Sequence, residues 1–208
     1  RTPIVTPSYS DGHIMRKKIW ILNQNATRNV VSQRGHHYWI VRELVKLGYE
    51  PIIFCSNFEH FARKYVHEEN NFMTWQDLPC GAKAVFVGAS AYQKSSGIAR
   101  IRNMFTFGHN LKKAVRQAAK TLGKPDVLYG SSPTPISIQI AEKLAKEFKC
   151  FSIAEVRDLW PESIFAYYPE KKKPFLAEYL YAKERKMYER AAGVFMTWAG
   201  GKDYVIEK

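Results

Sequence analysis

Four charged side chains crowd the stretch AEVRDLWPES, which begins at residue 154. They are Glu155, Arg157, Asp158 and Glu162, and they lie at the end of a run typical of a core strand. Charges rarely gather beside such a strand without partners or a task. Arginine can hold a phosphate through paired hydrogen bonds, and aspartate can accept hydrogen bonds from hydroxyl groups or act as a base. We therefore predict catalytic roles for Glu155, Arg157 and Asp158; the alternative is an arginine–carboxylate pair that tethers the next helix.

Two other segments carry residues suited to binding phosphate or hydroxyl groups. Gly35-His36-His37 opens an expected helix, where free N–H groups and a glycine favour an anion such as a diphosphate. Adjacent histidines on a helix point in different directions, so we do not expect them to bind one metal ion together. One of them, assigned as His36, would act as an acid–base or hydrogen-bonding group. The alternatives are a glycine that merely starts a helix and histidines that are packed or solvated.

The second segment is the turn Gly130-Ser131-Ser132-Pro133 between an expected strand and helix. Its hydroxyl and N–H groups could bind sugar or phosphate, and simple helix capping is the alternative. We predict binding roles for Ser131 and Ser132, together with Glu162, and no metal site.

Strands and helices alternate along the chain in a way that would place these segments together. Apolar runs predict strands at 18–23, 50–56, 83–89, 126–130, 150–155 and 193–197. Helical spacing and breakers predict helices at about 36–47, 98–122 (with a break at Gly108), 135–148, 175–191 and from about 200. This alternation predicts an α/β, Rossmann-like doubly wound sheet that is mostly parallel. Ligands of such sheets bind beyond the carboxyl ends of the strands, where the residues above fall.

Composition narrows the class of protein. The 208 residues suffice for one core, and the formal net charge of +13 attracts nucleic acid, anionic lipid or phosphorylated substrates. Three widely spaced cysteines without a CxxC pair argue against disulfides or structural zinc and favour a reducing cytosol. Residues 99–124 combine basic and aromatic side chains, which predicts contact with an anionic membrane or a lipid substrate. The alternative is an ordinary surface helix with one buried stripe. Residues 171–173, all lysine, are expected in a solvated loop.

The first fourteen residues show no helical or strand period, whereas Met15-Arg16-Lys17-Lys18 leads directly into an apolar strand. We interpret residues 1–14 as an expression leader, or alternatively a disordered native tail, and residues 15–208 as one domain.

Several segments together resemble a known enzyme family. They are DVLYGSSP at 126–133, EVRDLWPES at 155–163, YERAAGV at 188–194, KIWIL at 18–22 and RGHHY at 34–38. The sequence is similar to the family 4 (group 1) GT-B glycosyltransferases, and more narrowly to their fucosamine-transferase-like branch, over residues 15–208. The polar first loop departs from the Gly-rich loop of many relatives.

The resemblance implies a specific biology. The chain would be the N-terminal, acceptor-side half of a retaining enzyme, without the C-terminal half that binds the nucleotide-sugar, and would be inactive alone. The family usually needs no metal, so no cofactor is expected. The nucleotide-sugar donor would be a co-substrate. The acceptor would be a saccharide, typically linked to a lipid diphosphate, in the synthesis of surface polysaccharides such as lipopolysaccharide. The enzyme would then be cytoplasmic or peripheral at the inner face of the cell membrane.

Two other functions fit parts of the pattern. The net charge fits a nucleic-acid-binding module, although no recognised motif supports one and no nucleic acid is expected. Another Rossmann-type protein that binds a nucleotide or small ligand is the third hypothesis, but the GxGxxG and GxxxxGK[ST] fingerprints are absent.

Overall fold

A seven-stranded sheet forms the centre of the protein. The computed structural model describes residues 9–10, 13–14, 16–69, 71–93, 97–165 and 175–207. The strands lie in the order β11-β10-β9-β3-β4-β8-β7, all parallel except β7. Their bounds are Lys18–Leu22 (β3), Glu50–Ser56 (β4), Met73–Asp77 (β7), Lys83–Val87 (β8), Val127–Ser131 (β9), Phe151–Val156 (β10) and Gly193–Met196 (β11). Numbered along the chain, the six parallel strands follow the Rossmann order 3-2-1-4-5-6, which confirms the predicted fold class.

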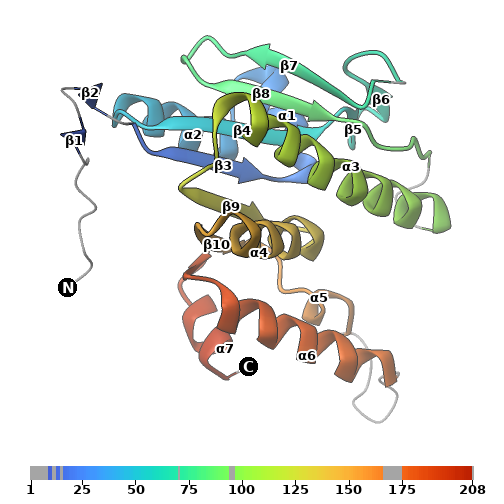
Figure 1. The fold of residues 1–208 in the computed structure, drawn as a ribbon. Helices are drawn as coiled ribbons and strands as arrows, with labels where there is room; N and C mark the ends of the chain where they lie inside the picture. The colour runs from blue at the N-terminus through green and yellow to red at the C-terminus, as the bar shows by residue number, and fades with distance from the viewer. Residues whose placement is uncertain are drawn as a thin grey trace.

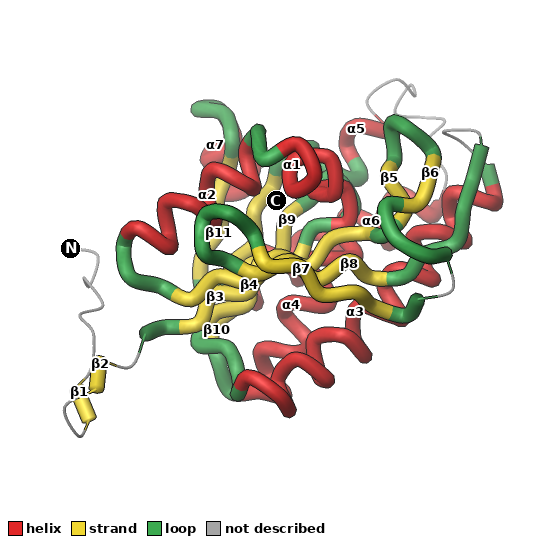
Figure 2. Tube along the Cα trace, turned by 90° about the horizontal axis from the view of Figure 1, so that it is seen from above, coloured by secondary structure: helices red, strands yellow, loops and turns green. Residues whose placement is uncertain are grey.

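Helices cover both faces of this sheet. The bounds are Gln24–Ala26 (η1, a 3₁₀ turn), Thr27–Ser32 (α1), His36–Lys46 (α2), Ile98–Leu122 (α3), Pro135–Phe148 (α4), Glu162–Phe165 (α5), Phe175–Arg190 (α6) and Gly201–Glu207 (α7). In Figure 1, α3 and α4 pass in front of the sheet while α1 and α2 lie behind it, and Figure 2 shows these layers from above. Residues 171–173 lie outside the described residues.

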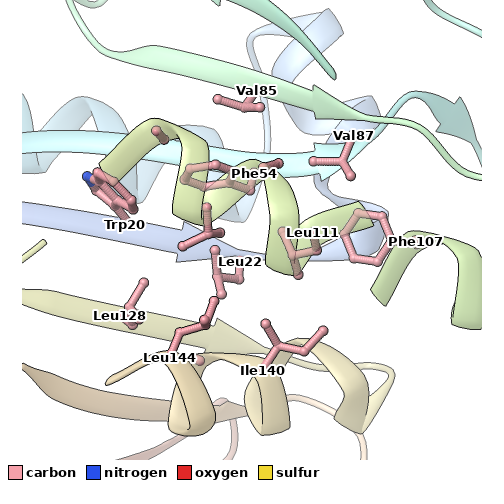
Figure 3. Close-up of a cluster of buried hydrophobic side chains, with 14 of the residues drawn as sticks. Trp20, Leu22, Phe54, Val85, Val87, Phe107, Leu111, Leu128, Ile140 and Leu144 are labelled. Atoms are coloured by element: carbon pink, nitrogen blue, oxygen red, sulfur yellow. The ribbon is translucent and has the colours of Figure 1, made fainter. Parts of the chain in front are cut away.

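The period of two along the strands divides the core between the two faces. Trp20, Leu22 and Phe54 point toward α3 and α4, where Phe107 and Leu111 pack on them (Figure 3). The residues between them point the other way, into a second cluster beneath α1 and α2 that includes Ile21, Ile53, Val30 and Val41. Full burial of each such side chain contributes about 1.5–3 kcal/mol.

Four features of the chain differ from, or add to, the elements predicted. The polar segment after β3 forms η1 and α1, and β7 joins the sheet antiparallel at its edge. Two short pairs are also present: Phe58–Glu59 with Lys64–Tyr65 (β5 and β6), and Tyr9–Ser10 with His13–Ile14 (β1 and β2). The break expected at Gly108 is wrong, because α3 runs through it. A Cβ on Gly108 would lie 2.6 Å from Ile136 Cδ1, so the glycine lets α3 approach α4.

The cysteines behave as small apolar residues. All three are free thiols, and burial raises the pKa of Cys55 to about 12 and that of Cys150 to about 11. Among the described residues no helix is both long and apolar enough to cross a bilayer.

Candidate functional site

Polar side chains meet at the carboxyl ends of β3, β9 and β10. The strand order reverses between β3 and β9, which is the place where open α/β sheets bind their ligands. Ser131 at the end of β9 is paired in register with Glu155 of β10, so both side chains leave the same face of the sheet. Asn23 follows β3 directly and lies beside them.

The first turn of α2 brings two histidines onto this edge. Gly35 precedes the helix with a φ of +95°, a conformation that L side chains rarely adopt. A Cβ at this position would also lie 2.4 Å from Asn29 Nδ2. The glycine is therefore needed for the turn and for the close approach of Asn29. Its predicted contact with a phosphate stays a prediction.

His37 is held from both sides of its ring. Its Nε2 lies 2.9 Å from Ser131 Oγ, and its Nδ1 lies 3.2 Å from Asn29 Oδ1. A proton on Nδ1 satisfies Asn29 and leaves Nε2 to accept from the Ser131 hydroxyl. Asn23 Nδ2 in turn donates to Ser131 Oγ at 2.9 Å and to the Ser132 carbonyl at 2.7 Å.

Glu155 lies at the centre of these contacts, and we call Glu155, His36, His37 and Ser131 the Glu155 cluster. The Glu155 side chain is only 2% exposed. One carboxylate oxygen, Oε1, accepts a hydrogen bond from His36 Nε2. The other, Oε2, is 3.5 Å from His37 Nε2 and has no hydrogen-bond partner among the described residues. The two imidazole planes differ by 85°, as expected for adjacent helical residues, yet both rings reach the same carboxylate.

The electrostatics of the cluster favour an ionised Glu155 beside a neutral His37. Burial opposes ionisation of Glu155, but close contacts with His37, Ser131 and His36 outweigh burial and hold its pKa at about 2. Burial lowers the pKa of His37; Glu155 counteracts this in part, and the charges of Arg157 and His36 add to it. Burial and the nearby carboxylate raise the pKa of Tyr129, which keeps its phenol protonated.

Ser132 ties the loop after β10 to the loop after β9. Its Oγ accepts hydrogen bonds from the backbone N–H of Arg157 at 2.7 Å and from that of Asp158 at 3.2 Å. Its own N–H donates to the Glu155 carbonyl at 3.0 Å. Because Ser131 and Ser132 are buried and engaged, their hydroxyls position neighbouring groups. The Arg157 side chain is half-buried and that of Asp158 is exposed.

Of the residues predicted for the site, Gly35, His36, Ser131, Ser132, Glu155, Arg157 and Asp158 are brought together. Glu162 is different, because its carboxylate accepts a hydrogen bond of 2.6 Å from the Tyr181 hydroxyl of α6. No contact of the described residues links Glu162 to the Glu155 cluster.

Three residues of the site were not predicted from the sequence. Asn23 is the last residue of the predicted strand 18–23, Asn29 stands in the polar segment that follows, and Tyr129 is within a strand. The position of Asn23 at the carboxyl end of the first strand was the available signal. The adjacent pair His36-His37 predicts one hydrogen-bonding group, assigned to His36, whereas the structure brings both rings to Glu155.

Comparison with known proteins adds little to this geometry. No family model and no curated protein matches the chain. A similar solved structure is that of a variant of Os79 from O. sativa in complex with UDP, which is 12% identical with a TM-score of 0.43. The match covers 89% of this chain and 48% of that one, so the chain spans about half of its length. The strand order, rather than this likeness, establishes the fold, and membership of family 4 stays a prediction.

Proposed function

We propose that this chain is the acceptor-side half of a glycosyltransferase that moves a sugar from a nucleotide-sugar to a saccharide. The observation that supports this most is the convergence of the Glu155 cluster with Arg157 and Asp158 at the switch point of a Rossmann-type sheet. Sugar transfer requires hydrogen-bonding groups for hydroxyls and cations for a departing diphosphate. This edge of the sheet offers both.

The residues divide into groups that touch substrate and groups that hold them. His36 and Asp158 are accessible, so they are placed to hydrogen-bond hydroxyls of the acceptor. Arg157 would neutralise the diphosphate, aided by the free N–H groups that begin α2. Glu155, Ser131 and Ser132 are buried and act as positioning residues. The nucleotide-sugar would be held mainly by a second domain, and the reaction would retain the anomeric configuration, as the resemblance to family 4 implies.

A lipid-linked acceptor is the finer part of this proposal. The first turns of α3 expose Ile98, Ile101 and Phe105, next to Arg102. Exposed apolar side chains beside a basic one suit the surface of an anionic membrane, where a lipid diphosphate carrier would lie. Phe107 of the same segment is buried in the core and takes no part. We place the enzyme at the inner face of the cell membrane, in surface polysaccharide synthesis.

The decisive experiment uses the chain joined to its proposed donor half. We expect Arg157→Ala or Asp158→Ala to lower the release of nucleoside diphosphate on transfer by about 10- to 100-fold, the range typical of a lost charge or hydrogen bond in the transition state. Urea unfolding should show both variants folded, since both positions are outside the core clusters. Arg185→Ala, which removes an exposed arginine of α6, is the matched control and should transfer normally.

Near-wild-type turnover of either variant would remove that residue from the site. Loss of activity in Arg185→Ala as well would show that transfer depends on the net positive charge of the chain rather than on the position of Arg157. The 208-residue chain can be tested directly against a short-chain polyprenyl diphosphate sugar and against duplex DNA. Salt-sensitive, tight binding to the duplex with none to the sugar lipid would favour the nucleic-acid hypothesis.

A further inference from the structure

Two histidines and a carboxylate converge in the Glu155 cluster with the spacing of metal ligands. His36, His37 and Glu155 each present one ligand atom, and these atoms all lie within 4.8 Å of one another. They come from two elements far apart in sequence, the start of α2 and the end of β10. We infer that these three side chains form a binding site for a divalent cation of the zinc class, with two imidazole nitrogens and one carboxylate oxygen as ligands.

The distances in the cluster suit a cation after a small movement. Zinc binds imidazole nitrogen and carboxylate oxygen at about 2.0–2.2 Å, which places two tetrahedral ligands about 3.4 Å apart. His37 Nε2 and Glu155 Oε2 are 3.5 Å apart. His36 Nε2 now contacts Oε1 more closely than a shared cation permits. Its side chain is 37% exposed, so the imidazole can turn outward without disturbing the core.

An unsatisfied oxygen supplies independent support. Glu155 Oε2 is buried and has no hydrogen-bond donor among the described residues, although the side chain carries a full charge at neutral pH. A buried ionised oxygen without a partner costs several kcal/mol unless a cation or donor meets it. A divalent ion beside Oε2 and the two rings would remove this cost.

The surroundings hold the ligands in the protonation states that metal binding needs. Asn29 Oδ1 lies 3.2 Å from His37 Nδ1, which fixes the proton there and leaves Nε2 with a lone pair. That lone pair accepts from the Ser131 hydroxyl, and a cation beside Glu155 would take the place of this hydrogen bond. The lowered pKa of His37 keeps this ring neutral, and the Glu155 carboxyl is deprotonated. Nitrogen ligands disfavour Mg²⁺ and Ca²⁺ and favour Zn²⁺ and its neighbours.

Two histidines and one glutamate are a ligand set that leaves zinc an open position. That position would accept an oxygen of a hydroxyl or phosphate group at the edge of the sheet. The inference goes beyond the proposed function and departs from the metal-free transfer that the family resemblance implies. It does not depend on sugar transfer, since it concerns only atoms of this chain.

The test is a titration of the EDTA-treated 208-residue chain with Zn²⁺ against a chromophoric chelator. We expect one ion per chain with a dissociation constant of about 1 µM or tighter. Glu155→Gln and His36→Ala should each weaken binding at least about tenfold, as the loss of a ligand requires. His109→Ala, an exposed histidine of α3, is the matched control and should bind like the wild type.

Cobalt provides a second measurement that does not depend on the stability of the Glu155 variant. Co²⁺ bound to the wild type should give the intense visible absorption of a four-coordinate ion, and His36→Ala, altered at a partly exposed site, should lose it. Absence of binding at about 100 µM, equal affinity in His36→Ala and wild type, or equal affinity for Mg²⁺ would overturn the inference. Nucleotide-sugars are absent from this titration, so its failure leaves the proposed function standing, and a failed transfer assay leaves the zinc site standing.

Discussion

Replacing Glu155 by glutamine should change how the stability of the protein depends on pH. In the folded chain the pKa of Glu155 is about 2, against an ordinary value of 4.5. A carboxyl whose pKa is lower in the folded state contributes stability above pH 4.5 and loses it as the pH falls toward 2. The two values differ by about 2.5, and each pKa unit corresponds to about 1.4 kcal/mol, so the full contribution is roughly 3 to 4 kcal/mol. No discount for solvent screening is needed, because the side chain is 2% exposed.

The measurement is urea unfolding of wild type and Glu155→Gln at about pH 6.5 and about pH 3.5, with EDTA present in both. Between these two conditions the wild type should lose roughly 1 kcal/mol more than the variant, since one pH unit separates 4.5 from 3.5. Burial lowers the pKa of His37 in the folded chain, so this residue also costs stability as the pH falls below 6.5, and in both proteins. Parallel losses in the two proteins would refute the idea that the buried carboxylate is ionised and held by its neighbours.

Two more predictions concern packing and the membrane surface. Gly130→Ala should destabilise the protein by about 1–3 kcal/mol in urea unfolding, as overpacking does. The added Cβ would lie 2.5 Å from Ile138 Cα, whereas Gly193→Ala meets nothing within 4 Å and should cost much less; equal costs would contradict this account of how α4 sits on β9. Phe105→Ser should weaken sedimentation with vesicles of anionic lipid, because Phe105 is 68% exposed beside Arg102. Phe151→Ser alters a side chain that is 67% exposed at the start of β10, and it should bind like the wild type unless any exposed phenylalanine suffices.

The sequence predicted most of the sheet, because buried strands and long amphipathic helices leave a period that can be read. The bounds of β4 and α4 agree with the structure to the residue. The edge strand β7 was not predicted, because its apolar and polar residues alternate weakly and it is partly exposed on both faces. Helix α1 was not predicted either, because it is short and mostly polar and so shows no clear helical period of apolar residues.

The sequence predicts those site residues that lie at the carboxyl ends of parallel strands, where ligands of such sheets bind. It does not predict the contacts that depend on how separate elements pack together. Ser131 and Glu155 end neighbouring strands, so their convergence could be foreseen. The shared contact of His36 and His37 with Glu155 could not, because it depends on how the first turn of α2 meets the sheet. Glu162 follows the same loop, but α5 turns its carboxylate toward α6.

The Asn23 side chain affects how the carboxyl edge of the sheet responds to acid. Its amide joins the end of β3 to Ser131 and Ser132 across the switch point, and it also accepts the N–H of Asn25. A side-chain amide is uncharged except in strong acid or strong base. The Asn23 amide therefore stays able to donate these hydrogen bonds at every physiological pH. Protonation of the Glu155 carboxylate would therefore change the charge of this edge while leaving the hydrogen bond between the Asn23 amide and the Ser132 carbonyl intact.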